Sequence, residues 1–288
     1  TSSAICVGGT ASITVAASLN GGSGSLSYQW QSSPDGSSSW TDVTVGTGIT
    51  TANYITDNLI TTTWFRCKIT SSTTSCTLFS NGVKVTVVPD PSITVQPTSG
   101  TICVGGNYTL SVTATNGTPS LTYQWQSSTT SGSGFTDISG ATSNTFNTGT
   151  INTVQTTYYQ CVVSASGNGC NSITSSEATV TVVLDPVVSD QPDDVTICDG
   201  TSTTLNVVAT GGTGTLLYQW QSSSNGTTFA NISGATSNSY VTPTLNNDTF
   251  YKVIITQAAS GCLVESTIAK VSVAKISVQP TTPIDICV

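Results

Sequence analysis

Nine cysteines are the residues of this 288-residue chain whose type and spacing could carry chemistry. The chain has no histidine and no Cys-x-x-Cys spacing, so the common ligand patterns of zinc sites are missing. Disulfides in an oxidising compartment are therefore the expected use of these thiols. In chain order the cysteines are Cys6, Cys67 and Cys76, then Cys103, Cys161 and Cys170, then Cys198 and Cys262, and finally Cys287.

The third group of cysteines decides the predicted pairing because it has only two members. Cys198 and Cys262 are the one pair available within that group, and Val253 stands nine residues before Cys262. The first two groups have a further cysteine at that position. By analogy, three bridges within single repeats are predicted, namely Cys6–Cys76, Cys103–Cys170 and Cys198–Cys262.

The remaining cysteines, Cys67, Cys161 and Cys287, are predicted to be free or intermolecular thiols. Because valine replaces the first two in the third group, they are expected to act as small buried apolar residues. A pairing across the last hairpin stays open as an alternative, since Cys67 and Cys161 each lie nine residues before another cysteine. That alternative would join Cys67 to Cys76 and Cys161 to Cys170.

The cysteines recur because the whole chain repeats. The segment YQWQSS stands at Tyr28–Ser33, Tyr123–Ser128 and Tyr218–Ser223, a period of 95 residues. A period of this length indicates three copies of one small domain. The predicted boundaries are 1–90 with its first strand missing, 91–186, 187–275, and 276–288 as the first strand of a next domain or a donor strand.

Each copy contains seven or eight short segments that alternate apolar and polar residues, as in Tyr108–Ala114, and no helical periodicity. We therefore predict an all-β fold of three tandem immunoglobulin-like β-sandwich domains. The linkers around Pro89–Pro91 and Pro186 are short and contain proline, which predicts a semi-rigid rod.

Aromatic residues at fixed places in the repeat are predicted to form the core. Alternation in the YQW segment directs the tyrosine and tryptophan to one face, where an immunoglobulin domain has its core tryptophan. Tyr159 and Tyr251 stand where a tyrosine corner would be, whereas the first copy has Phe65 there. The predicted core tryptophans are Trp30, Trp125 and Trp220.

The order ICxGG (Ile5–Gly9, Ile102–Gly106), YQW, YYxC (Tyr158–Cys161), GC and a closing TVTV strand (Thr179–Val182) resembles the immunoglobulin-like repeats of large secreted surface proteins of Bacteroidota. The second strand departs from antibody domains because it carries no cysteine. The resemblance implies secretion through the type IX route and roles in adhesion, gliding or display beside enzymes. An extracellular location, secreted or at the cell surface, is therefore expected.

The composition excludes several partners. A net charge of −8 and an isoelectric point near 4.1 disfavour nucleic acid and anionic membranes. No apolar run approaches the roughly 20 residues of a membrane span. We find no catalytic constellation, so the chain is expected not to be an enzyme and to need no cofactor. The alternative to a chain without cofactors is calcium bound at the acidic junction of domains 2 and 3. Its oxygen ligands would come from Asp185, Asp190, Asp193, Asp194 and Asp199.

The ends of the chain are out of phase with the repeat. The first copy lacks the strand that precedes ICxGG in the others, while Ile276–Pro280 supplies such a strand after the third copy. Two explanations remain open: the chain is cut from a longer array, or subunits join head to tail by strand donation. One detail weighs against simple donation, since Cys287 would arrive beside Cys6. The predicted assembly strand comprises Ile276, Val278, Ile284 and Ile286.

These patterns predict a structural subunit or segment of an extracellular bacterial fibre or adhesin. Its expected partners are copies of itself, joined head to tail, and also surface glycans or host and abiotic surfaces. The alternative is a carbohydrate-binding or spacer region of a secreted enzyme. Trp40 and Trp64, which have no tryptophan counterparts in the other copies, are the candidates for a sugar site.

Overall fold

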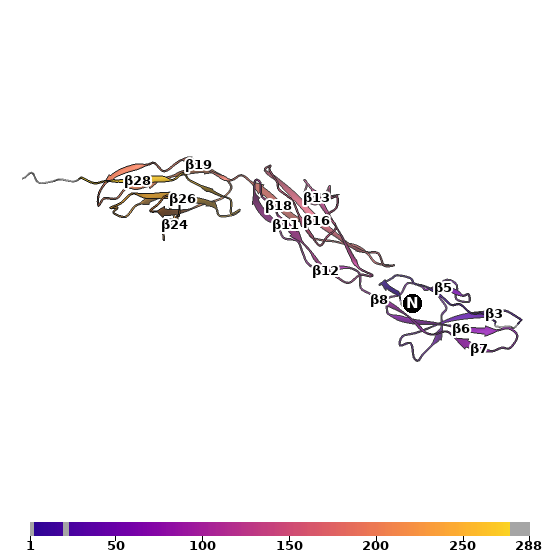
Figure 1. Ribbon diagram of the computed structural model, residues 1–288. Coiled ribbons are helices and arrows are strands. Elements are labelled where there is room, and N and C mark those ends of the chain that lie inside the picture. The colour runs from indigo at the N-terminus through magenta and orange to yellow at the C-terminus, as the bar shows by residue number, and fades with distance from the viewer. Residues whose placement is uncertain (1–2, 20–22, 277–288) are drawn as a thin grey trace, which may run out of the picture. The chain divides into compact units, whose positions relative to one another are not determined.

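The computed structural model describes residues 3–19 and 23–276, and every regular element within them is a β-strand (Figure 1). The chain divides into two compact units. One consists of Thr1–Ser99, Thr109–Thr148 and Thr157–Thr179, and the other of Gly100–Tyr108, Gly149–Thr156 and Val180–Val288. Within the described residues, no helix is long and apolar enough to span a membrane.

The first repeat folds as a β-sandwich with one large and one small sheet. The large sheet has the order β1-β8-β6-β3-β4, with β7 paired to β6, and the small sheet pairs β2 with β5. Its strands are β1 (Ser3–Cys6), β2 (Ser12–Thr14), β3 (Leu26–Ser33), β4 (Thr41–Asp42), β5 (Asn53–Ile55), β6 (Thr63–Ser71), β7 (Thr77–Phe79) and β8 (Val83–Val88).

The second repeat has the same large sheet, in the order β10-β18-β16-β13-β14 with β17 on β16. It also contains two small sheets, β11 with β15 and β9 with β12. Its strands are β9 (Ser92–Val95), β10 (Gly100–Cys103), β11 (Thr109–Ser111), β12 (Thr113–Thr115), β13 (Leu121–Ser128), β14 (Thr136–Asp137), β15 (Thr145–Asn147), β16 (Gln155–Ala165), β17 (Ile173–Thr174) and β18 (Ala178–Val183).

The third repeat repeats the second. Its large sheet has the order β20-β28-β26-β23-β24 with β27 on β26, and β19 pairs with β22 and β21 with β25. Its strands are β19 (Pro186–Asp190), β20 (Val195–Cys198), β21 (Thr204–Asn206), β22 (Val208–Gly211), β23 (Leu216–Ser223), β24 (Ala230–Asn231), β25 (Ser239–Val241), β26 (Thr249–Gln257), β27 (Leu263–Glu265) and β28 (Ala269–Ala274).

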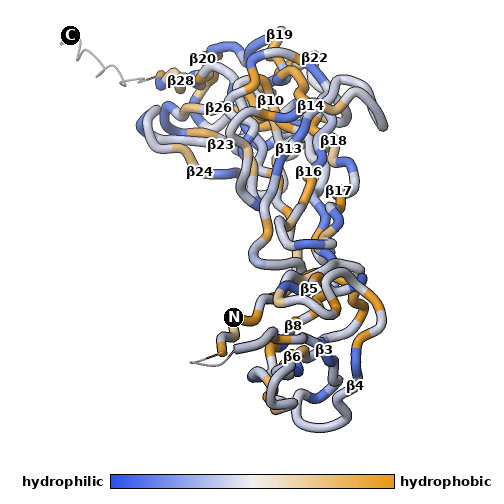
Figure 2. Tube along the Cα trace, turned by 90° about the vertical axis from the view of Figure 1, so that its right-hand side faces the viewer, coloured by the Kyte–Doolittle hydropathy of each residue, from blue (hydrophilic) through white to orange (hydrophobic). Residues whose placement is uncertain are grey.

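Each core is built around one tryptophan, and the hydrophobic residues lie in short stretches of the strands between polar ones (Figure 2). Trp30, Trp125 and Trp220 are at most 1% exposed. Their indole Nε1 atoms donate hydrogen bonds of 2.9–3.0 Å to backbone carbonyls, so burial leaves the polar end of each ring satisfied. Phe65, Tyr159 and Tyr251 occupy equivalent buried positions on β6, β16 and β26.

Two features of this topology position the residues discussed below. The strand that ends in the first cysteine of each repeat runs parallel to the last strand of that repeat, with Cys6 beside Val88, Cys103 beside Val183 and Cys198 beside Ala274. Each of these cysteines therefore lies at the end of the repeat where the last strand finishes and the chain leaves the sandwich. In addition, β9 and β19 have no counterpart among the described residues of the first repeat.

Candidate functional site

Among the described residues, two disulfides join successive repeats. Cys6 of the first repeat is bonded to Cys170 of the second, with the Cα atoms 4.8 Å apart. Cys103 of the second repeat is bonded to Cys262 of the third, with a Cα separation of 5.5 Å. Each disulfide lies inside one of the two compact units. Both connect the same two positions, the ICxGG cysteine of one repeat and the cysteine before the short strand β17 or β27 of the next.

The predicted pairing within single repeats, Cys6–Cys76, Cys103–Cys170 and Cys198–Cys262, is therefore wrong. The reason is the length of the sheet. Cys6 lies next to Val88, near the beginning of β6, whereas Cys76 follows the end of that nine-residue strand. At about 3.3 Å per residue, the two ends lie roughly 25–30 Å apart, far beyond the span of a disulfide.

The alternative hairpin pairing is also absent. Cys67 and Cys161 are free cysteines with no exposed surface. In the large sheet of their repeats they lie opposite Trp30 and Trp125 on the neighbouring strand. Burial raises the pKa of both thiols, that of Cys161 to about 11. Cys76 and Cys198 are free and exposed. Cys287 lies outside the described residues.

Polar contacts surround the first disulfide. The backbone N–H of Cys6 donates to the carbonyl of Asn168 at 2.9 Å, and that of Thr10 donates to Asn168 Oδ1 at 2.8 Å. On the other side, Asp90 of the linker accepts hydrogen bonds from the backbone N–H and Nδ2 of Asn171, at 3.0 and 2.9 Å. These bonds lower the pKa of the Asp90 carboxyl. The bridge is thus accompanied by non-covalent contacts between the same two repeats.

Two glycines let the backbones approach at this junction. A Cβ on Gly9 would lie 2.4 Å from the carbonyl oxygen of Asn168, and a Cβ on Gly169 would lie 2.4 Å from the Cα of Gly9. Gly169 also has a φ of +77°, which disfavours other residues. Any side chain at either position would push the two repeats apart. Sequence reasoning missed Gly169 and Asn168, which differ from their counterparts in the first repeat.

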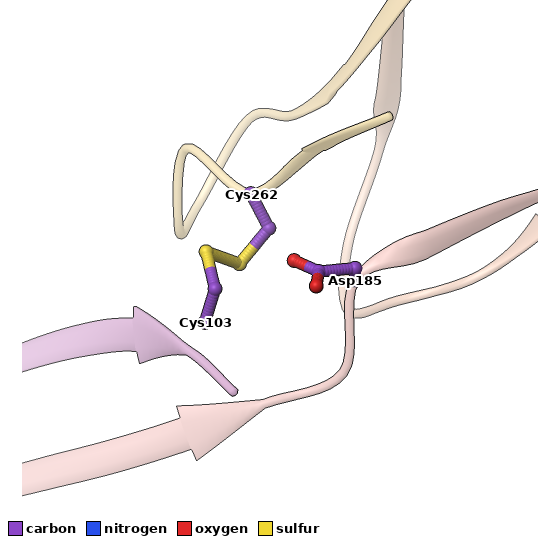
Figure 3. Close-up of side chains that lie close together, drawn as sticks. All are labelled: Cys103, Asp185 and Cys262. Atoms are coloured by element: carbon purple, nitrogen blue, oxygen red, sulfur yellow. A yellow bond between two sulfur atoms is a disulfide. The ribbon is translucent and has the colours of Figure 1, made fainter. Parts of the chain in front are cut away.

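The second disulfide has an acidic neighbour, Asp185 of the linker, shown with Cys103 and Cys262 in Figure 3. Among the described residues, these three are the only His, Cys, Asp or Glu side chains that gather closely enough to hold one metal ion, with atoms within 4.8 Å of one another. Cysteine binds metals as a thiolate, and here both sulfurs are bonded to each other. The arrangement is a disulfide beside a linker carboxylate.

The other acidic residues of the proposed calcium cluster do not join Asp185 in that group. Asp194 instead accepts a 2.6 Å hydrogen bond from the backbone N–H of Lys270. Asp190 lies in β19, paired with Val208 of β22. The remaining members, Asp193 and Asp199, are likewise absent from the group of possible ligands.

The candidate sugar-binding residues pack at the edge of the first repeat. Trp40 and Trp64 are each partly buried. The guanidinium of Arg66 lies 4.4 Å from the centre of the Trp40 ring and 4.2 Å from that of Phe79. A Cβ on Gly36 would lie 2.5 Å from the Trp64 ring. One face of each indole is therefore covered by the protein's own residues.

The predicted assembly strand lies almost wholly outside the described residues. Ile276 is 84% exposed. Val278, Ile284 and Ile286 fall in the range 277–288, which the structure does not describe.

Comparison with known proteins identifies the family. One family model, a domain of unknown function (DUF8696), matches residues 1–89, 92–184 and 189–275. The chain belongs to this family, as three consecutive copies.

Solved structures with a similar fold are built from tandem domains. The three N-terminal domains of the highly immunogenic outer capsid protein of bacteriophage RB49 align with a TM-score of 0.55 at 12% identity, over 95% of this chain and 96% of that one. Extracellular domains 3–5 of Drosophila OTK align over 96% and 94% of the two chains, at 15% identity and a TM-score of 0.44. The predicted fold of three tandem immunoglobulin-like β-sandwiches is confirmed by the sheets of the three repeats, the threefold family match and the bacteriophage structure.

One curated protein shows sequence similarity. Endoglucanase C of Cellulomonas fimi is 30% identical over 178 residues, which are 61% of this chain. The match spans only 16% of the length of that relative.

Proposed function

We propose that this chain is a non-catalytic structural segment of an extracellular fibre or adhesin, in which disulfides between successive repeats reinforce the array. The observation that carries the proposal is the pair of overlapping loops closed by Cys6–Cys170 and Cys103–Cys262, with sequence separations of 164 and 159 residues. Bonds of this kind have no role in catalysis, whereas in a protein that carries a pulling force they prevent the chain from being extended.

The overlap of the loops limits how far the chain can be pulled out. In the oxidised protein, the shortest covalent path from Cys6 to Cys262 passes through the first disulfide to Cys170. It then follows the backbone back to Cys103 and passes through the second disulfide to Cys262. Between the outer cysteines, only the roughly 67 residues from Cys103 to Cys170 can extend, about 230 Å at 3.3–3.6 Å per residue. Without the bonds, roughly 256 residues extend to about 900 Å.

Single-molecule stretching of the chain held at its two ends tests this proposal. The oxidised protein should reach a contour length shorter by several hundred ångström than the same protein in a thiol reductant. A Cys161→Val variant is the matched control, because it removes a thiol outside the bridges and should extend like the parent. Equal extension with and without reductant would contradict a mechanical role for the bonds.

The same features support an extracellular location, secreted or at the cell surface. Disulfides persist in oxidising compartments. Secretion through the type IX route of a Bacteroidota species is part of the proposal and rests on the sequence resemblance. Fractionation of a producing strain, followed by detection of the chain in the medium or on the cells, tests this part.

The similarity to Endoglucanase C favours a second candidate function, a spacer or carbohydrate-binding region of a secreted enzyme. Binding of a sugar ring needs an exposed aromatic face. Arg66 stacks on one face of the Trp40 ring, so a sugar would have to stack on the other face or displace the arginine. A glycan array probed with the chain and with a Trp40→Ala variant separates the two candidates. Micromolar binding that the substitution abolishes would favour the carbohydrate-binding candidate.

A further inference from the structure

Three of the chain's six lysine and arginine residues, Arg66, Lys68 and Lys84, gather on one face of the large sheet in the first repeat. Arg66 and Lys68 are two residues apart on β6, so their side chains lie on the same face, and the alternate residues of β6 belong to the core. Lys84 of β8 lies directly opposite Trp64 of β6, which is two residues from Arg66. The outer face of this sheet is therefore cationic, in a chain whose net charge is −8.

Arg66 is held in place by its neighbours on this face. The guanidinium lies 4.4 Å from the centre of the Trp40 ring and 4.2 Å from that of Phe79, and its Nε donates a 2.9 Å hydrogen bond to Gln31 Oε1. The carboxylate of Asp42 accepts a 2.7 Å hydrogen bond from Gln31 Nε2. The two terminal nitrogens of Arg66 donate no hydrogen bond to any residue that the structure describes. They present a planar fork that matches the two oxygens of a carboxylate.

In the third repeat, the counterpart of Arg66 is neutralised by a carboxylate. By strand register, Lys252 of β26 corresponds to Arg66, and Glu265 of β27 corresponds to Phe79. Lys252 Nζ lies 2.7 Å from Glu265 Oε2. In the first repeat, an aromatic ring takes the place of that carboxylate.

A second lysine of the third repeat is neutralised in the same way. Lys270 of β28 corresponds to Lys84 of β8, and Asp248 corresponds to Thr62. Lys270 Nζ lies 2.8 Å from Asp248 Oδ2, and Asp248 Oδ1 accepts a backbone hydrogen bond from β28. The Thr62 hydroxyl accepts the equivalent backbone hydrogen bond, at 3.0 Å, but carries no charge. Within the described residues, none of the three cations of the first repeat forms an ion pair.

Aromatic surface surrounds these cations. Phe79 is 51% exposed, and Trp40 and Trp64 are partly exposed. The two indoles meet at Gly82, where a Cβ would lie 3.4 Å from the Trp40 ring and 3.5 Å from the Trp64 ring. The third repeat has Ile268 at the equivalent position. The glycine therefore leaves the edges of both rings uncovered at this point.

The arrangement defines the chemistry of a ligand. Cations without partners in their own repeat attract an anion from outside it. Arg66 and Lys68 lie about 6.6 Å apart along β6, which suits charges repeated along a polymer better than one compact anion. Partly exposed aromatic rings favour the flat apolar faces of sugar rings. An acidic polysaccharide supplies both the carboxylates and the rings.

We propose that the outer face of the first repeat binds a polysaccharide that carries uronate carboxylates. Arg66 is the main anchor, and Lys68 and Lys84 contact carboxylates of neighbouring sugar units. The inference rests on the proposed adhesin role and deepens it by naming the class of ligand.

Biolayer interferometry of the full oxidised chain on immobilised oligogalacturonate tests the proposal, with a neutral cello-oligosaccharide of similar length as the comparison. The chain should bind oligogalacturonate with micromolar affinity and the neutral oligosaccharide much more weakly. Raising the salt concentration from about 50 to about 500 mM should weaken binding about tenfold, because exposed charges are screened.

Four variants separate the contributions. Arg66→Ala should weaken binding about tenfold to a hundredfold, because hydrogen bonds to a charged group are lost. Arg66→Lys retains the charge without the fork and should still weaken it several-fold. Thr62→Asp combined with Phe79→Glu introduces the carboxylates that the third repeat accommodates at these positions, and should abolish binding. Lys270→Ala, which removes a paired lysine from the third repeat, is the matched control and should bind like the parent.

The outcomes that overturn the proposal are equally specific. Parental affinity of both Arg66→Ala and the double variant would show that this face is not the site. Equal binding of the neutral oligosaccharide would show that charge is not recognised. Equal or tighter binding of poly-glutamate or of a single-stranded oligonucleotide would overturn the ligand class. Thermal melts followed by circular dichroism verify that each variant is folded.

The inference and the proposed function can fail separately. If no probe binds and Cys6–Cys170 and Cys103–Cys262 are recovered, the ligand class is wrong and the reinforced array remains. If the two disulfides are absent, the reinforced array is wrong, and binding by this one sheet face is measured independently of them.

Discussion

Unequal burial of two equivalent isoleucines predicts that their substitution has unequal costs in the first and third repeats. Ile255 is fully buried beneath β19, so Ile255→Ala should lower the free energy of unfolding of the third repeat by about 3–4 kcal/mol. Ile69 occupies the equivalent place on β6 but is only partly buried, and no strand among the described residues covers it as β19 covers β26. Ile69→Ala should therefore cost roughly half as much, about 1–2 kcal/mol.

Hydrogen exchange read by mass spectrometry measures the two costs separately, since peptides from β6 and β26 report on their own repeats. A single unfolding curve would not suffice, because a chain of three domains need not unfold in one step. Equal costs would refute the conclusion that the two isoleucines are covered to different degrees.

Three further predictions concern thiols and the linker. Cys161→Val should change the free energy of unfolding of the second repeat by less than about 1 kcal/mol in denaturant titration, because Val253 fills the same place in the third repeat. Cys161→Ser should cost about 1–3 kcal/mol, because it buries a hydroxyl. Burial raises the pKa of Cys161 from 9.0 to about 11, so the folded repeat keeps the proton that the unfolded chain loses. Stability should therefore fall as the pH rises from about 9 to about 11, and Cys161→Val should reduce that slope in thermal melts, while Cys67 still contributes to it. Asp90→Ala removes both hydrogen bonds to Asn171 and should speed reduction of Cys6–Cys170 by dithiothreitol about twofold to fivefold, measured by quenched mass spectrometry; an unchanged rate would show that these bonds do not hold the junction.

The sequence was sufficient to predict the fold because the repeat and the alternation of side chains are local. YQWQSS recurs at a constant period, and alternation on one strand is enough to direct Trp30, Trp125 and Trp220 inward. The first repeat differs from the others in the same pattern, and its described strands include no counterpart of β9 or β19. Leu78 is exposed there and Ile69 is partly buried.

The disulfide pairing could not be predicted by counting cysteines within a repeat, because it depends on which end of a sheet each one occupies. The ICxGG strand is parallel to the last strand, a pairing that sequence patterns do not reveal, and this places Cys103 at the far end from Cys170. A signal was nevertheless present. An Asp-Pro pair recurs in both linkers, at Asp90 and Asp185, and each of these aspartates lies at a bridged junction.

The central claim is that disulfides join successive repeats, and mapping of peptides from unreduced protein tests it most directly. After alkylation of free thiols and digestion, the account predicts linked peptides containing Cys6 with Cys170 and Cys103 with Cys262, and alkylated Cys76 and Cys198 in the monomer. Recovery of Cys6 linked to Cys76, or of Cys103 linked to Cys170, would contradict it.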